Sequence, residues 1–221
     1  SEKRKEALER IFFHDVINTA GALQGVVDLM RHLDDPLKIT QFIDLLAAVS
    51  QDLTEEILNQ KSLLDAENGN LAFKKQEFYL RETLEHIIKE YQRHELALNK
   101  EIHFEEKSSE ILINTDPVLL RRVISNMIKN ALEAISPEER ITIDCVSKPD
   151  AVIIRIHNPG GIPGNVQKQI FQRSFSTKGK GRGLGTYSMK LLGERYLNAE
   201  ISFTSSAEKG TVFSLRLPVP E

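Results

Sequence analysis

The sequence predicts an α+β protein in which a helical hairpin precedes a sandwich of helices and a sheet. Two long amphipathic helical patterns fill residues 1–65, and a short turn separates them. After residue 70, helical patterns mix with short β-rich runs. Residues 67–70, Glu-Asn-Gly-Asn, break the periodicity between the two parts. We therefore expect two domains, residues 1–67 and residues 68–221.

The composition is that of an ordinary globular protein. The chain has 221 residues, of which 28% are charged and 40% hydrophobic, and its formal net charge is −3. This charge gives no reason to expect a nucleic-acid partner. The one cysteine, Cys145, stands in an apolar run, which predicts a buried thiol in a reducing compartment.

The first predicted helix, residues 1–33, has apolar residues spaced alternately by four and three, a heptad pattern. These residues are Phe12, Val16, Leu23, Val26, Met30 and Leu33, with Thr19 as a weak member. His14 falls on the opposite side, where Asn18, Gly21 and Gly25 follow it. Glycine costs about 1 kcal/mol inside a helix, so two on one face indicate a docking surface. The alternative is a solvent-facing histidine without a function.

The second predicted helix, residues 37–65, repeats the heptad pattern after a turn at Asp34-Asp35-Pro36. Its apolar members are Ile39, Ile43, Leu46, Leu53, Ile57 and Leu64, interrupted by Ser50 and Gln60. One hairpin cannot bury both apolar stripes fully. Two hairpins from two chains would form a four-helix bundle, so we expect a homodimer.

The second domain combines two periods. Strands are expected at residues 71–73, 102–104, 110–114, 141–146, 151–157, 200–205 and 212–217. Helices are expected at residues 78–94, 116–135, 166–171 and 186–196. Asp116 followed by Pro117 is a helix start signal, because aspartate caps the helix and proline suits its first turn. Strand pairs with short turns and helices between them favour an α+β sandwich.

Two asparagines interrupt the apolar helix expected at residues 116–135. Asn126 and Asn130 are four residues apart and therefore face the same way, with Lys129 beside them. Asparagine is a poor helix former, so either both amides are buried and hydrogen-bonded or they bind a ligand. An amide oxygen can ligate Mg²⁺, and an amide nitrogen can contact phosphate.

Two glycine-rich loops follow. Gly181, Gly183 and Gly185 alternate directly before the helix expected at residues 186–196. Such glycines let backbone N–H groups approach phosphate oxygens, and the helix N-terminus adds its dipole, although a flexible turn explains many such matches. The second loop, residues 159–164, is rich in glycine and proline and follows the strand expected at residues 151–157.

In this order the motifs resemble those of sensor histidine kinases of two-component signalling, over almost the whole chain. His14-Asp15-x-x-Asn18 resembles the phosphoacceptor box, and NMIKNALEA resembles the N box. NPGGIP stands where the first glycine box is expected, and IFQRSFSTKG, with Phe171 and Phe175, resembles the F box. GRGLGTY is similar to the second glycine box, and GTVFSLRLP to the closing strand.

The resemblance implies a dimerisation and histidine-phosphotransfer domain followed by an ATP-binding domain of the Hsp90, gyrase and histidine-kinase type. It implies autophosphorylation of His14, with Asp15 accepting or orienting the ring proton, and transfer to an aspartate of a response regulator. It also implies phosphatase activity, in which Asn18 orients a water molecule. The expected location is the cytoplasm, where the chain would be part of a longer protein with an upstream sensing or membrane segment.

The resemblance also implies the nucleotide site, with ATP and Mg²⁺ as cofactors and Asn130 as the Mg²⁺ ligand. The residues expected to contact the nucleotide are Asn126, Lys129, Asn130, Asn158, Gly160, Phe175, Lys178, Gly181, Arg182, Gly183, Leu184, Gly185, Thr186 and Thr211.

The first glycine box departs from the family, which has Asp-x-Gly-x-Gly with the aspartate on adenine. Either His157 or Asn158 takes the place of that aspartate. Ile154, Ile156 and Asn158 share one strand parity, so we expect Asn158 to point inward and to accept a hydrogen bond from the adenine amine. This bond lacks the charge of a carboxylate.

Two other functions remain open. A pseudokinase of the same fold would bind or dephosphorylate a regulator with little ATP turnover. Another ATPase of the same superfamily would share the second domain, but the hairpin with its outward His14 argues against it.

Overall fold

The computed structural model describes residues 2–31, 35–105, 111–172 and 185–218. The chain divides into two compact units, one with the helices up to Leu71 and one that begins at Ala72. Among the described residues, no helix is both long and apolar enough to cross a membrane.

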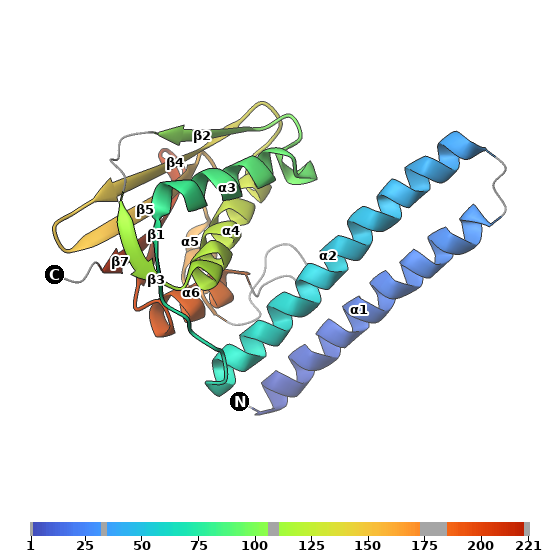
Figure 1. The fold of residues 1–221 in the computed structure, drawn as a ribbon, viewed down its shortest axis with the longest axis horizontal. Helices are drawn as coiled ribbons and strands as arrows, with labels where there is room; N and C mark the ends of the chain where they lie inside the picture. The colour runs from blue at the N-terminus through green and yellow to red at the C-terminus, as the bar shows by residue number, and fades with distance from the viewer. Residues whose placement is uncertain (1, 32–34, 106–110, 173–184, 219–221) are drawn as a thin grey trace. The chain divides into compact units, whose positions relative to one another are not determined.

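The first unit consists of helices α1 (Glu2–Met30) and α2 (Pro36–Asn68), which lie side by side (Figure 1). Both predicted helices are confirmed, whereas Asp34 of the predicted turn lies outside the described residues. Asp35 caps α2 by accepting a hydrogen bond from the backbone N–H of Leu37 at 3.0 Å. Gly69 ends the helix with a φ of 77°, a conformation that glycine adopts at little cost.

The second unit contains a five-stranded mixed sheet and a two-stranded ribbon. The sheet has the order β2-β4-β5-β7-β6, in which β2 and β4 are parallel and the other neighbours antiparallel. Its strands are β2 (Glu101–Glu105), β4 (Arg140–Ser147), β5 (Ala151–Asn158), β6 (Glu200–Ser206) and β7 (Gly210–Pro218). The ribbon pairs β1 (Gln76–Tyr79) with β3 (Leu112–Thr115).

Helices α3, α4 and α6 cover one face of the five-stranded sheet (Figure 1). The helical elements of this unit are α3 (Leu80–Gln92), the 3₁₀ helix η1 (Glu95–Ala97), α4 (Pro117–Glu133), α5 (Gly164–Gln167) and α6 (Gly185–Arg195). The core lies between these helices and the sheet, where Ile124, Ile143 and Ile154 are fully buried. The thiol of Cys145 is buried in β4, as the sequence predicts.

Two expectations for the start of this unit are wrong. No strand forms at residues 71–73; the strand is β1, and its position is set by its antiparallel pairing with β3 rather than by the nearby apolar run. Phe73 of that run is 38% exposed. Because Phe78 and Tyr79 belong to β1, helix α3 begins at Leu80 and not at Phe78.

Asp116 links the ribbon to helix α4. Its side chain is 5% exposed and accepts hydrogen bonds from Val118 N at 2.9 Å and Leu119 N at 3.0 Å. Its other oxygen accepts from Lys74 N at 2.7 Å, just before β1. The predicted cap with Pro117 in the first turn is confirmed, and it also fixes the incoming chain.

We expect Asp116→Ala to lower the free energy of unfolding by about 2 kcal/mol, because both a helix cap and a buried acceptor are lost. Asp35→Ala is the matched control, since its exposed carboxylate accepts, among the described residues, from Leu37 N alone, and it should cost about 1 kcal/mol or less. Urea unfolding followed by circular dichroism measures both. Equal losses would show that the contact with Lys74 contributes nothing.

Candidate functional site

Strand β5 ends with its last inward side chain at Asn158. Ile154 and Ile156 are fully buried, and Asn158 is 3% exposed on the same face, so the predicted strand parity is confirmed. His157 points to the other face, is half-buried, and has its Nε2 2.9 Å from the carbonyl oxygen of Lys209. Of the two candidates for the missing aspartate, only Asn158 faces the interior of the unit.

The backbone around Asn158 is tightly packed. Its Nδ2 donates to the carbonyl oxygen of Gly160 at 3.1 Å, and the hydroxyl of Thr211 donates to the same oxygen at 2.7 Å. Thr211 is 1% exposed and pairs with Asn158 across β5 and β7. Gly210 has a φ of 71°, and a Cβ there would lie 2.2 Å from the carbonyl oxygen of Asn158. Asn158, Gly160 and Thr211 therefore form one cluster.

The asparagines of helix α4 lie against the first turn of helix α6. A Cβ on Gly185 would sit 3.7 Å from Asn126 Oδ1 and 3.9 Å from Asn130 Oδ1. Helix α4 turns its apolar residues to the core, which leaves the asparagines on a flank of the helix. Helix α6 begins at Gly185. The first N–H groups of a helix have no partner within the helix and lie at the positive end of its dipole, which favours an anion.

Asn130 carries an orphaned polar atom. Its Nδ2 is buried and has no hydrogen-bond partner among the described residues. An unmade hydrogen bond of this kind costs about 1–3 kcal/mol, so a ligand that supplies an acceptor would recover that energy. The amide oxygen of the same side chain is a suitable ligand for Mg²⁺. The site therefore fits a phosphate group together with a hard cation.

Helix α4 also carries a cation that the sequence analysis missed. Arg122 lies one turn before Asn126, is half-buried, and has no hydrogen bond or ion pair with any described residue. Burial lowers the pKa of its guanidinium from the ordinary value. Its spacing of four from Asn126 is the signal that could have revealed it. Lys129, by contrast, is exposed.

The other predicted residues fall into three groups. Thr186 is described, and its hydroxyl donates to the carbonyl oxygen of Ile170. His14 and Asp15 lie in helix α1, where their side chains are outside the description, and Asn18 is exposed on the same helix. The remaining residues expected to contact the nucleotide lie outside the described residues: Phe175, Lys178, Gly181, Arg182, Gly183 and Leu184.

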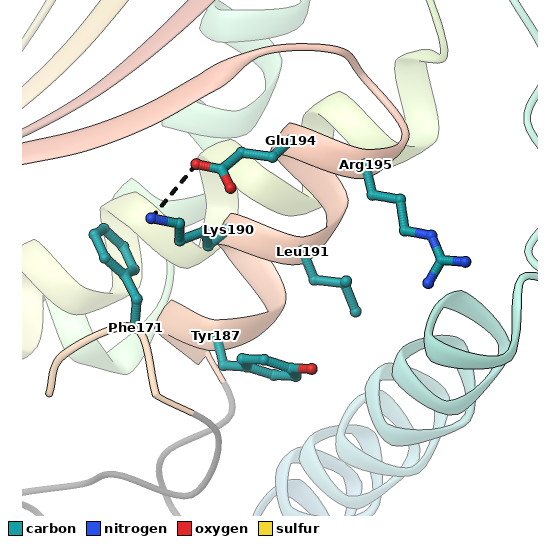
Figure 2. Close-up of a pocket in the computed structure, with 6 residues that line it drawn as sticks. All are labelled: Phe171, Tyr187, Lys190, Leu191, Glu194 and Arg195. Atoms are coloured by element: carbon teal, nitrogen blue, oxygen red, sulfur yellow. Dashed lines mark ion pairs between the residues drawn. The ribbon is translucent and has the colours of Figure 1, made fainter.

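A separate hollow of about 300 Å³ lies on helix α6. Figure 2 shows Lys190 between Phe171 and Glu194, with its Nζ 4.7 Å from the ring centroid and 3.5 Å from a carboxylate oxygen. Its other lining residues are Tyr187, Leu191 and Arg195. Among the described residues that line this hollow, none is expected to bind a nucleotide.

Comparisons with known proteins bear on the second unit and on the whole chain. Residues 115–221 match the family described as "Histidine kinase-, DNA gyrase B-, and HSP90-like ATPase". Sporulation kinase C of Bacillus subtilis is 27% identical over 209 residues, which cover 93% of this chain and 47% of that protein. Sensor protein kinase PilS of Pseudomonas aeruginosa is 25% identical over 217 residues, covering 94% and 39%. The chain thus spans less than half the length of these relatives.

Solved structures show the same folds. The catalytic domain of histidine kinase ThkA is 25% identical, with a TM-score of 0.61 over 66% of this chain and 96% of that one. ThkA in complex with the response regulator protein TrrA is 23% identical, with a TM-score of 0.68 over 99% of this chain and 65% of that one. The second likeness concerns the fold alone.

We expect Asn130→Ala to stabilise the nucleotide-free chain, because it removes a buried Nδ2 that no described residue partners. Alanine also favours the helix by about 0.6 kcal/mol, and Asn126→Ala is the matched control for that effect. The gain in unfolding free energy should be larger for Asn130→Ala by about 1 kcal/mol. Urea unfolding without nucleotide decides; equal gains would mean that the orphaned amide costs nothing.

Proposed function

Since the chain belongs to the sensor histidine kinases with an ATPase domain of the gyrase B and HSP90 type, we propose that it transfers the γ-phosphoryl group of ATP to His14. The phosphoryl group then passes to an aspartate of a response regulator. The observation that carries this proposal is the buried Nδ2 of Asn130, which has no hydrogen-bond partner in the described part of the chain, beside the N-terminus of helix α6. It is the arrangement that a phosphate with its cation would complete.

The second unit supplies the nucleotide site in this proposal. Asn158 would accept from the adenine amine, while Asn126, Lys129 and the N–H groups at Gly185 would contact phosphates. Mg²⁺, held by the Asn130 oxygen, would neutralise phosphate charge. The remaining predicted contacts are Gly160, Phe175, Lys178, Gly181, Arg182, Gly183, Leu184, Thr186 and Thr211.

The first unit supplies the acceptor. A neutral imidazole is available near pH 7, since the ordinary pKa of histidine is about 6.5. The His14 ring nitrogen would attack the γ-phosphorus as the bond to the leaving ADP oxygen breaks. Asp15 would take or orient the proton on the ring, which stabilises the charge that develops there.

We also propose that the first unit forms a homodimer. Several large apolar side chains of the described hairpin remain exposed, which a single hairpin cannot prevent. They are Phe13, Ile17, Val27, Leu29, Leu37, Ile43, Leu45, Ile57 and Leu58. A second hairpin would cover part of this surface in a four-helix bundle. Sedimentation at micromolar concentration is the check, and a monomer there would contradict the dimer.

A pseudokinase is the second candidate, and one observation favours it. Asn158 replaces a carboxylate with a neutral amide, so its hydrogen bond to adenine is weaker by the charge-assisted part. The chain would then act on a regulator without useful ATP turnover. Nucleotide titration separates the two, because only a kinase needs ATP affinity in the range of cellular ATP.

Incubation with γ-labelled ATP and Mg²⁺ should label the chain through a linkage that acid breaks and alkali does not. His14→Ala should abolish the label, because the nucleophile is gone. His103→Ala, on an exposed position of β2, is the matched control and should keep full labelling. Label that persists in His14→Ala would contradict the assignment, and no label in any variant would favour the pseudokinase.

We expect Asn18→Ala to spare autophosphorylation and to slow dephosphorylation of a regulator that the chain itself has phosphorylated. Asn18 is exposed one helical turn after His14, where its amide could orient the attacking water. The loss should be about a hundredfold, typical of misplaced reactants. Gln24→Ala, an exposed amide on another side of α1, is the control. Equal loss of both activities would show that Asn18 is structural.

A further inference from the structure

The loop that follows Asn158, the residue in place of the missing aspartate, is held by a series of hydrogen bonds between segments far apart in the sequence. Ile162 N donates to Ser205 Oγ at 2.7 Å, and Ser205 Oγ lies 2.7 Å from Thr211 Oγ1. Thr211 Oγ1 in turn lies 2.7 Å from the Gly160 carbonyl oxygen. All four groups belong to the second unit.

The direction in which each hydroxyl group donates in this series of hydrogen bonds is fixed. The Gly160 carbonyl can only accept, so the single hydroxyl proton of Thr211 goes to it. Ser205 must then donate its own proton to Thr211, and its oxygen accepts from Ile162 N. Neither the Ser205 nor the Thr211 hydroxyl can therefore rotate without breaking a hydrogen bond.

The same carbonyl fixes the amide of Asn158. An atom 3.1 Å from the Gly160 oxygen has to be a donor, so Nδ2 faces it. Turning the amide over would place two carbonyl oxygens against each other inside the unit, where Asn158 is 3% exposed. The Oδ1 atom is therefore the part of the amide left for a ligand, and it makes no hydrogen bond with any described residue.

A second set of contacts holds the loop in this position. Gln167 Nε2 donates to the Ile162 carbonyl at 2.7 Å and approaches the Ser205 carbonyl at 3.3 Å. Gly161 packs so closely that a Cβ there would lie 2.8 Å from the Ser206 carbonyl oxygen. The part of the loop that follows Gly160 is thus held against the end of β6.

We propose that Ser205 is a positioning residue that, through Thr211 and the Gly160 carbonyl, locks the Asn158 amide with its oxygen toward the base and makes the site select adenine over guanine. The inference rests on the proposed nucleotide site. Adenine presents an amine where guanine presents a carbonyl, so a locked acceptor pairs only with adenine. A freely turning asparagine would serve both bases, whereas an aspartate needs no lock because both its oxygens accept.

The test measures ADP and GDP affinities of the whole chain by calorimetric titration. The wild type should bind ADP more tightly than GDP. Ser205→Ala should lower the ratio of ADP affinity to GDP affinity about tenfold, the loss expected for one hydrogen bond. Ser205→Thr, which keeps the hydroxyl, should have the wild-type ratio. Ser202→Ala, an exposed serine of the same strand, is the matched control and should leave it unchanged.

A double variant separates positioning from a general structural role. Asn158→Asp removes the amide whose orientation matters, because both carboxylate oxygens are acceptors, so adding Ser205→Ala to Asn158→Asp should leave its ratio of ADP to GDP affinity unchanged. If Ser205→Ala folds poorly, Ser205→Cys replaces it in the test, because cysteine roughly keeps the volume of the side chain but is a weak donor. It should show the same fall in the ratio. A further tenfold fall in the ratio when Ser205→Ala is added to Asn158→Asp would overturn the lock.

The outcomes for the inference and for the nucleotide site are distinct. A wild-type chain that binds ADP, with the same ratio in Ser205→Ala, would overturn the inference and leave the proposed function standing. A wild-type chain that binds neither nucleotide would overturn both. Side-chain amide resonances of the free chain give an independent reading, since Asn158 NH₂ should lose its protection from exchange in Ser205→Ala.

Discussion

Helix α4 has to serve two opposed environments, and the site depends on how it does so. One face buries Leu120, Ile124 and Ile128 completely. Each such side chain contributes about 1.5–3 kcal/mol by leaving water, and several of them outweigh the cost of about 1–3 kcal/mol for the orphaned amide of Asn130. The helix can therefore hold an unsatisfied donor in place before any ligand arrives. Such prior positioning lowers the cost of binding.

A similar balance explains how the loop after β5 can do without a carboxylate. A buried carboxylate makes the stronger hydrogen bond, but taking its charge out of water is costly. The amide of Asn158 is cheaper to bury and has two different ends, so its orientation has to be set by neighbours. The hydroxyls of Ser205 and Thr211 and the Gly160 carbonyl provide that orientation. In the proposed contact with adenine, a weaker hydrogen bond is thus combined with surroundings that fix the orientation of the amide.

The sequence was most informative where the physics is local. Helical periodicity predicted α1, α2 and α4, the Asp116-Pro117 pair marked a helix start, and strand parity turned Asn158 inward. It was least informative where a partner far along the chain decides. Strand β1 forms at residues 76–79 because β3 pairs with it. Ser205 meets Ile162 across 43 positions, and no local pattern predicts such a contact.

The division into units places a further constraint on the proposed chemistry. Asn126, Asn130 and Asn158 belong to the second unit, whereas His14 belongs to the first. Each unit has its own helices or sheet to hold its groups, so the proposed nucleotide site belongs to the second unit and the proposed acceptor to the first. The proposed phosphoryl transfer requires an encounter of the two units, because reacting atoms must approach to about 3–3.5 Å. A signal that changes only the frequency of this encounter would control the rate of transfer and leave nucleotide affinity unaltered.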